Sequence, residues 1–222
     1  MTIGGGIIAK SMRGMSTDAT IFASGVSNSA CTDTSEFLRE RDLILAQDHR
    51  KKIVYFSTCS LSDASETNAY ICHKLEMEKL ISERFDNWLV LRLPTVVGSG
   101  GNPNNFFNFI ASTLKRGDTL YVQSKVRRSL LDAEDIRILT QHLIEHESHQ
   151  IVDVCLDNSR PVLEIVNYMR DLIGSKSEIV ILDDKQNKEI DNSLLRRLNP
   201  EGFSKVNIDS YNEKLTKKYL PK

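Results

Sequence analysis

The sequence predicts an α/β fold built on a parallel β-sheet with helices on both of its faces. Segments 52–57, 88–93 and 151–156 are short and largely apolar, as strands buried on both faces are. Between them, residues 35–50 and 68–85 carry apolar side chains at helical spacing among charged ones. Apolar strands that alternate with helices in this way are typical of a parallel sheet.

Length and composition allow one well-packed domain with a small additional part. The chain has 222 residues, of which 40% are hydrophobic and 27% charged, and its formal net charge is −1. This charge gives no general attraction to nucleic acid or to an anionic membrane, so we expect neither partner. The 4 cysteines lack metal-ligand spacing, and no apolar run is long enough to span a bilayer. We therefore expect a cytoplasmic protein with reduced thiols.

The amino-terminal elements are the shortest of the predicted sheet. An apolar start at residues 1–3 leads into a glycine cluster and a helix-compatible stretch, and a short strand at 19–25 follows. The pattern Gly4-x-Gly6-x-x-Ala9 is typical of a turn whose backbone approaches a dinucleotide pyrophosphate at a helix N-terminus. Because ligands bind beyond the carboxyl ends of parallel strands, we expect the functional residues to follow the strands.

The strongest functional signal is Tyr70-x-x-x-Lys74, which opens the helix after the strand that ends near Thr58. Residues four apart lie on one helical face, so the phenol and the ammonium lie side by side. We expect the ammonium to favour phenolate and to lower the pKa of Tyr70 toward the working pH. A hydroxyl at the strand end, Thr58 or alternatively Ser57, can hold a substrate oxygen against the phenol. An unrelated surface Tyr–Lys pair is the competing interpretation, and the order of strand, hydroxyl, loop and helix argues against it.

Four motifs in this order resemble the extended short-chain dehydrogenases/reductases of the NAD-dependent epimerase/dehydratase family, which modify sugar nucleotides. They are the active-site segment 56–80, the strand and loop 91–98, the asparagine loop 103–106, and 127–135, which is similar to the family's "RDxxHVxD" segment. The resemblance implies a Rossmann-like, doubly wound parallel sheet with a small α/β carboxy-terminal substrate-binding part. The expected dinucleotide-binding core is 1–98, to which strand 151–157 returns, and the substrate-binding part is 99–150 with 158–222.

The resemblance also implies roles for individual residues. Tyr70 would be the acid/base, Lys74 its electrostatic partner and a cofactor-ribose contact, and Thr58 the catalytic hydroxyl. Arg128 would grip the nucleotide diphosphate with its guanidinium, unless it forms a solvated basic pair with Arg127. The expected contacts with NAD or NADP are Gly4, Gly6, Ile7, Ile8, Ala23, Ser24, Leu93 and Pro94, and those with the substrate are Thr95, Asn105 and Arg128.

The sequence departs from the family pattern in two places. Between Ala9 and Ala19 there is no counterpart to the usual second and third strands or to the acidic residue that binds the adenosine ribose. We therefore expect a sheet shortened at its N-terminal side, weakened cofactor binding, and no basis for choosing between NAD and NADP. Cys59 and Ser60 stand where dehydratases carry an Asp-Glu pair. This favours an NAD(P)-dependent epimerase or keto-reductase acting on a nucleotide-activated sugar.

A non-catalytic nucleotide- or sugar-binding scaffold with a regulatory or assembly role is the alternative function. The missing adenosine region favours it, and the intact Tyr70, Lys74 and Thr58 oppose it. The resemblance also implies that the enzyme serves polysaccharide or glycoconjugate precursor synthesis. It further implies a homodimer that pairs the helix carrying Tyr70 with its copy.

The remaining histidines and cysteine with possible functional roles are interpreted as structural residues. His142-Leu-Ile-Glu-His146 matches a zinc pattern, with His149 a turn further on, but its polar surroundings favour solvated histidines at a helix end, and we expect no metal. We expect His73 to lie on another helix face among surface groups. Cys59 is expected to be a small buried residue rather than a proton donor.

Overall fold

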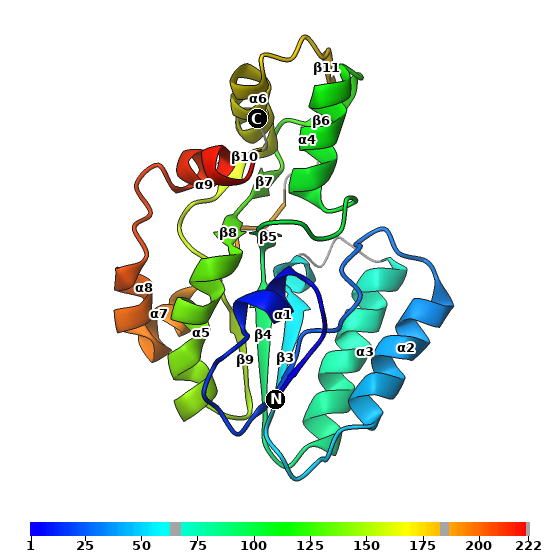
Figure 1. Cartoon of the computed structure of the whole chain (residues 1–222), viewed down its shortest axis with the longest axis vertical. Coiled ribbons are helices and arrows are strands. Elements are labelled where there is room, and N and C mark those ends of the chain that lie inside the picture. Colours follow the sequence, from blue (N-terminus) through cyan, green and yellow to red (C-terminus); the bar gives the residue numbers. More distant parts are fainter. Residues whose placement is uncertain (63–67, 183–186, 221–222) are drawn as a thin grey trace.

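A five-stranded parallel sheet forms the centre of the molecule (Figure 1). The computed structural model describes residues 1–62, 68–182 and 187–220. The strand order is β1-β2-β3-β4-β9, and every neighbouring pair is parallel, which confirms the predicted fold class. The strands are β1 (Thr2–Ile3), β2 (Thr20–Phe22), β3 (Ile53–Thr58), β4 (Trp88–Leu93) and β9 (Gln150–Asp153).

Successive side chains of the central strands enter two separate cores, one on each face of the sheet. Val54 packs in the core that includes α5 (Ala133–His146), together with the short α1 (Ile7–Ser11). Its neighbour Tyr55 packs on the opposite face, in the core formed with α2 (Thr34–Leu45) and α3 (Ala69–Arg84). Because a strand alternates its side chains between faces, a sheet covered on both sides needs apolar residues at nearly every position. This accounts for the continuous apolar run of β3.

The helices of the second core begin at capping residues that the sequence supplies. The carboxylate of Asp33 accepts a hydrogen bond from the backbone N–H of Ser35 and starts α2, and the side chain of Asn68 accepts one from Ile71 and starts α3. The prediction placed α3 within one residue at each end. It extended α2 five residues too far, because a polar turn closed by Asp48 and Arg50 follows Leu45.

The amino-terminal edge of the sheet is as small as the sequence indicates. β1 has 2 residues, α1 has 5 and β2 has 3, and β1 is the last strand on its side of the sheet within the described chain. Gly4 joins β1 to the turn with a φ of +125°, and a Cβ there would lie 2.2 Å from the carbonyl oxygen of Ala23. Only glycine fits this position, since the backbones of two neighbouring strands approach each other closely there.

A second group of elements lies beyond the carboxyl ends of the strands (Figure 1). It contains small two-stranded sheets and two amphipathic helices that pack against each other. The predicted residue boundaries of the two parts remain a prediction. The elements are β5 (Thr95–Val97) with β8 (Leu130–Asp132), β6 (Leu120–Gln123) with β11 (Ile179–Leu182), β7 (Arg127–Arg128) with β10 (Arg160–Pro161), α4 (Phe106–Arg116) and α6 (Val162–Ile173).

The carboxy-terminal segment, for which the sequence predicted no helix, contains three short helices. These are α7 (Ser193–Leu198), α8 (Pro200–Lys205) and α9 (Tyr211–Tyr219). The phenols of Tyr211 and Tyr219 donate to Asp135 and Asp132, which fastens α9 to the start of α5. None of the helices in the described part of the chain is long and apolar enough to cross a bilayer.

Candidate active site

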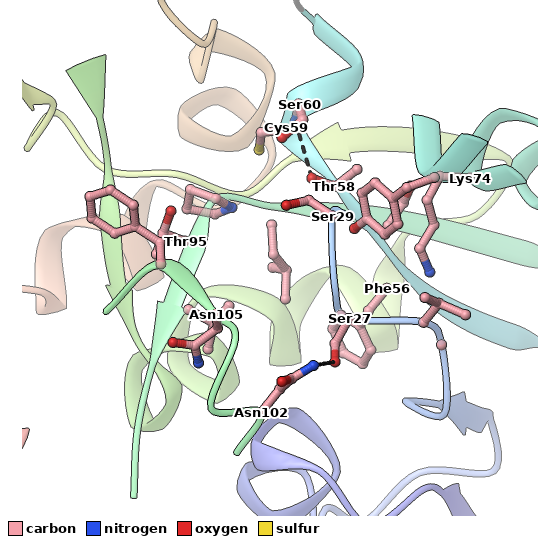
Figure 2. Close-up of a pocket in the computed structure, with 18 of the residues that line it drawn as sticks. Ser27, Ser29, Phe56, Thr58, Cys59, Ser60, Lys74, Thr95, Asn102 and Asn105 are labelled. Atoms are coloured by element: carbon pink, nitrogen blue, oxygen red, sulfur yellow. Dashed lines mark hydrogen bonds between the residues drawn. The ribbon is translucent and has the colours of Figure 1, made fainter. Parts of the chain in front are cut away.

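A cavity of about 520 Å³ lies at the carboxyl ends of the central strands, where open α/β sheets bind their ligands. Its walls come from both groups of elements. Figure 2 shows Thr58 and Lys74 on one side, and Thr95 and Asn105 on the other. Across it, the amide of Asn102 donates to the hydroxyl of Ser27 at 3.5 Å and links the two walls.

The structure brings the predicted site residues together in this cavity, with one exception. Among the described residues that form its wall, Gly4 is absent, because its conformation serves the close approach of β1 and β2. The neighbouring Gly5, which was not predicted, lines the cavity instead. The predicted residues that do line it are Gly6, Ile7, Ile8, Ala23, Ser24, Thr58, Tyr70, Lys74, Leu93, Pro94, Thr95, Asn105 and Arg128.

Thr58 and Tyr70 meet because the carboxyl end of β3 lies beside the first turn of α3. The Asn68 cap fixes the first turn of α3 and thereby places Tyr70, which is 7% exposed, beside the strand end. The Thr58 hydroxyl accepts a hydrogen bond from the backbone N–H of Ser60 at 3.2 Å (Figure 2). The Tyr70 phenol lies near this hydroxyl, which lowers the pKa of the phenol. The Thr58 hydroxyl accepts from Ser60 and keeps its own proton, which it can donate toward the phenol oxygen or a ligand.

Lys74 is buried in an ion pair that the sequence analysis did not foresee. Its ammonium, on a residue 2% exposed, donates to a carboxylate oxygen of the fully buried Glu40 at 2.9 Å and to the phenol of Tyr55 at 2.9 Å. The Lys74 nitrogen lies 5.9 Å from the centre of the Tyr70 ring. The Tyr–Lys pair is therefore a Tyr–Lys–Glu group.

Burial, together with this carboxylate, reverses the expected effect on Tyr70. Burial raises the pKa of Tyr70 to about 12, with a partial lowering by Thr58 and a smaller rise from the charge of Glu40. Burial also lowers the pKa of Lys74, against the opposing effect of Glu40. The expectation that Lys74 lowers the pKa of Tyr70 toward neutrality is wrong for the unliganded protein, because burial of the phenol raises this pKa and Glu40, which is paired with the ammonium, adds to the rise.

The predicted environment is wrong for His73 and confirmed for Cys59. The expectation of surface partners for His73 is wrong: it is buried, its Nε2 lies 3.0 Å from Glu40 Oε2, and its ring stacks on Phe37. Cys59 is buried as expected, with its thiol directed to the carbonyl of Arg92 at 3.2 Å. Burial raises the pKa of the Cys59 thiol well above its ordinary value, so it stays protonated.

Glu40 could have been suspected from the sequence. It follows Phe37 by three residues and precedes Ile44 by four, so a charged residue stands on the apolar stripe of a predicted helix. A charged residue at such a position is buried with a partner or has a function. The partners Tyr55 and Lys74 come from distant parts of the chain, and no local pattern joins them to Glu40.

The opposite wall carries the predicted substrate contacts Asn105 and Arg128. Asn105 caps α4 by accepting from the backbone N–H of Asn108 at 2.8 Å, which leaves its amide nitrogen for a ligand. The Arg128 guanidinium lies 5.9 Å from the centre of the Phe106 ring. Arg127 donates to the carbonyl of Ser159 at 2.7 Å and pairs with Glu189. Arg127 is therefore not a simply solvated residue, and the role of Arg128 stays a prediction.

The cavity suits an anionic ligand that carries phosphates. Five basic residues line it, and the described residues of its wall include no Asp or Glu. Three of the five form ion pairs with carboxylates outside the wall, namely Arg39, Lys74 and Arg127. A Cβ added at Gly5 or at Gly6 would meet nothing within 4 Å, so their backbones border open space. The Ser57 hydroxyl is buried in the wall without a hydrogen-bond partner among the described residues. The basic residues are Arg39, Lys74, Arg127, Arg128 and Lys188.

The histidines of the zinc-like pattern lie away from this cavity. The rings of His142 and His146 in α5 are tilted by 46° relative to each other, with centres 4.4 Å apart. His149 lies beyond the end of that helix, with its Nε2 3.0 Å from the carbonyl of Asp86. Across residues 1–62, 68–182 and 187–220, no group of three or more His, Cys, Asp or Glu is placed to hold a metal ion.

No family model matches the sequence and no curated protein matches it, but solved structures share its fold. RMD from Pseudomonas aeruginosa, complexed with NADPH, has a TM-score of 0.70 at 18% identity, covering 91% of this chain and 81% of that one. The dTDP-glucose 4,6-dehydratase from Bacillus anthracis, with NAD, has a TM-score of 0.72 at 11% identity, with coverages of 98% and 78%. The UDP-glucuronic acid 4-epimerase from Bacillus cereus, in complex with UDP-glucuronic acid and NAD, has a TM-score of 0.70 at 16% identity. The match covers 96% of this chain and 77% of the epimerase chain. The chain therefore has the fold of extended short-chain dehydrogenases/reductases, in a form shorter than these neighbours.

Proposed function

We propose that the protein is an NAD(P)-dependent enzyme that acts on a nucleotide-activated sugar as an epimerase or keto-reductase. The observation that carries this proposal is the meeting of Thr58, Tyr70 and Lys74 in one cavity at the carboxyl edge of the parallel sheet. Structural neighbours that were solved with NAD, NADPH or UDP-glucuronic acid support the general kind of function.

In this proposal Tyr70 exchanges a proton with the reacting oxygen of the sugar. Thr58 lines the cavity beside Tyr70 and can hold the same substrate oxygen in place. A bound nicotinamide would supply or accept the hydride at the adjoining sugar carbon. Cys59 and Ser60 provide no carboxylic acid beside Thr58, which supports epimerisation or keto-reduction over elimination of water.

The two walls divide the ligands between them. Gly6, Ile7 and Ile8 would hold the cofactor diphosphate, Ala23 and Ser24 would leave it space, and Leu93 and Pro94 would form an apolar face for the nicotinamide. Thr95, Asn105 and Arg128 would contact the sugar nucleotide, with the Arg128 guanidinium matched to a diphosphate.

The biological setting is part of the same proposal. The neighbours' nucleotide-sugar ligands support a role in polysaccharide or glycoconjugate precursor synthesis. All four cysteines are free thiols, which supports a cytoplasmic location. We also propose a homodimer that pairs α3 with its copy.

A non-catalytic scaffold is the second candidate, and one observation favours it. The sheet ends at the two-residue β1, so no further strand of the described chain frames the adenosine end of a dinucleotide. A scaffold of this kind would bind a nucleotide or sugar without needing Tyr70.

A turnover assay with matched tyrosine variants tests the proposal. The protein is incubated with a panel of nucleotide sugars and either reduced or oxidised cofactor, and products are followed by mass spectrometry. We expect Tyr70→Phe to lower turnover by about 100-fold or more, since it removes the proton-transfer group. The control is Tyr121→Phe, because Tyr121 is 65% exposed on β6. Unchanged turnover in Tyr70→Phe would refute the mechanism, and no product with any sugar would favour the scaffold.

A further inference from the structure

We propose that Glu40 is a positioning residue of the active site: it holds the Lys74 ammonium in place and neutralises it, so that the unliganded protein presents Tyr70 as a proton donor. The inference rests on the proposed function in one respect, that Tyr70 is the group that exchanges a proton with substrate. It predicts which way that exchange begins. A site whose tyrosine is protonated before ligands arrive is prepared for the reduction of a keto group.

The surroundings of Glu40 are those of a charge fixed in one geometry. The residue is fully buried, and each carboxylate oxygen has two partners. Oε1 accepts from the Tyr55 phenol at 2.6 Å and from the Lys74 ammonium at 2.9 Å. Oε2 accepts from the backbone N–H of Val26 at 2.6 Å and lies 3.0 Å from His73 Nε2. Partners from β3, α3 and the loop after β2 thus converge on one side chain of α2.

Lys74 is part of the cavity wall, and its partner Glu40 is buried beside it. Gly25 lines the cavity beside Lys74, and a Cβ at Gly25 would lie 2.6 Å from the Lys74 nitrogen and 2.9 Å from Glu40 Oε1. Only a glycine at this position lets the backbone rest against the pair without displacing it. A ligand that enters over Gly25 therefore meets an ammonium whose charge is already balanced.

The electrostatic effect follows from this geometry. Although burial alone would raise the pKa of Glu40, the Lys74 ammonium and the hydrogen bonds from His73 and Tyr55 bring it down to about 2. The carboxylate therefore stays ionised at neutral pH, and the Lys74–Glu40 pair carries no net charge toward Tyr70. The other titratable or charged groups that act on this cluster are His73 on Glu40, Tyr55 and Arg39 on Lys74, and Glu78 on Lys74 and Tyr55.

The chemical consequence concerns the first proton transfer. In keto-reduction the carbonyl oxygen of the substrate would take up the phenol proton of Tyr70, and a bound reduced nicotinamide would supply the hydride to the carbonyl carbon. The phenolate left behind regains a proton from water. The reverse reaction must begin with a phenolate, which the neutral Lys74–Glu40 pair does not stabilise.

The test is a spectroscopic titration of Tyr70 in the whole, unliganded protein. Phenolate absorbance in the near ultraviolet is followed against pH in the wild type and in Glu40→Gln, and subtraction of the matching Tyr70→Phe background isolates the step of Tyr70. We expect this step near pH 12 in the wild type and at distinctly lower pH in Glu40→Gln, because the ammonium is then unbalanced. The control is Glu83→Gln, which removes an equal charge from the exposed side of α3 and should leave the step in place.

An unmoved Tyr70 step in folded Glu40→Gln, or an equal shift in Glu83→Gln, would overturn the proposal. Because these titrations use neither substrate nor cofactor, their outcome is separate from the turnover test of Tyr70→Phe.

A second measurement needs no variant at position 40. The side-chain ¹⁵N signal of Lys74, assigned by its loss in Lys74→Arg, reports whether the ammonium is charged and protected from exchange. We expect a charged, slowly exchanging ammonium at neutral pH in the wild type, as its bonds to Glu40 and Tyr55 require. A neutral amine or a freely exchanging ammonium would overturn the proposal even if Glu40→Gln fails to fold.

Discussion

The two ends of the cavity are built in opposite ways. Around Tyr70, buried polar and charged groups are fastened by hydrogen bonds from several elements, and Glu40 alone has four partners. At the amino-terminal edge, a two-residue strand and a five-residue helix meet through backbone contacts at Gly4. The first region depends on side-chain chemistry, and the second depends on a shape that only glycine allows.

This difference indicates where function constrains the chain. A buried ion pair contributes little net stability, since well-packed apolar residues of similar volume are often as good or better. The fold alone therefore gives no reason to keep Glu40 and Lys74 beneath the cavity. At the amino-terminal edge, by contrast, the requirement is steric and is met by small residues and short elements.

The largest expected effect comes from breaking the Glu40–Lys74 pair. Glu40→Gln and Lys74→Met should each lower the free energy of unfolding by about 3–5 kcal/mol, because each leaves one buried charge without its partner. The double variant should lose much less than the sum of the two single losses. Urea denaturation of the wild type, both single variants and the double variant measures this coupling.

The control for this double-mutant cycle is the exposed pair Lys79–Glu83. It lies on α3, the helix that carries Lys74, and its nitrogen–oxygen distance is 3.7 Å. Its variants should change stability by less than about 1 kcal/mol. If the buried and the exposed pairs give the same coupling free energy, the claim that the region around Tyr70 depends on buried charge pairing is wrong.

A smaller effect is expected at the amino-terminal edge. Gly4→Ala should lower the free energy of unfolding by about 1–3 kcal/mol, since a side chain there is both strained at a φ of +125° and in collision with the Ala23 carbonyl. Amide hydrogen exchange should show the loss of protection in β1 and β2 first. Gly5→Ala is the control, because a Cβ there meets nothing within 4 Å. Equal losses in both variants would contradict the steric account of Gly4.

Much of the fold could be predicted from local patterns in the sequence. The continuous apolar run of β3, the Asn68 cap of α3 and the glycines after β1 each act within a few residues, so their elements were placed correctly. The helices near the carboxy-terminus were missed because their anchors are long-range. Tyr211, for example, bonds to Asp135, which lies 76 residues away in the chain.

The candidate site follows the same rule. The i, i+4 spacing was enough to place Tyr70 and Lys74 on one face of a helix, and the strand order was enough to bring Thr58 to them. The pKa of Tyr70 was mispredicted because it depends first on the burial of the phenol and then on Glu40, which reaches Lys74 across 34 positions of sequence. Which groups share a helix face is local information, whereas their pKa values depend on the whole tertiary structure.

The central claim is that this shortened sheet still binds a nicotinamide cofactor beside Tyr70, and a binding titration tests it most directly. Wild-type protein is titrated with NADH and with NADPH, and binding is followed by the fluorescence of the reduced nicotinamide and by calorimetry. We predict saturable binding of at least one of them, weakened by replacing Gly6, whose backbone borders the cavity, with a bulky residue. Absence of binding of either cofactor at millimolar concentration would contradict the claim and leave the non-catalytic scaffold as the better description.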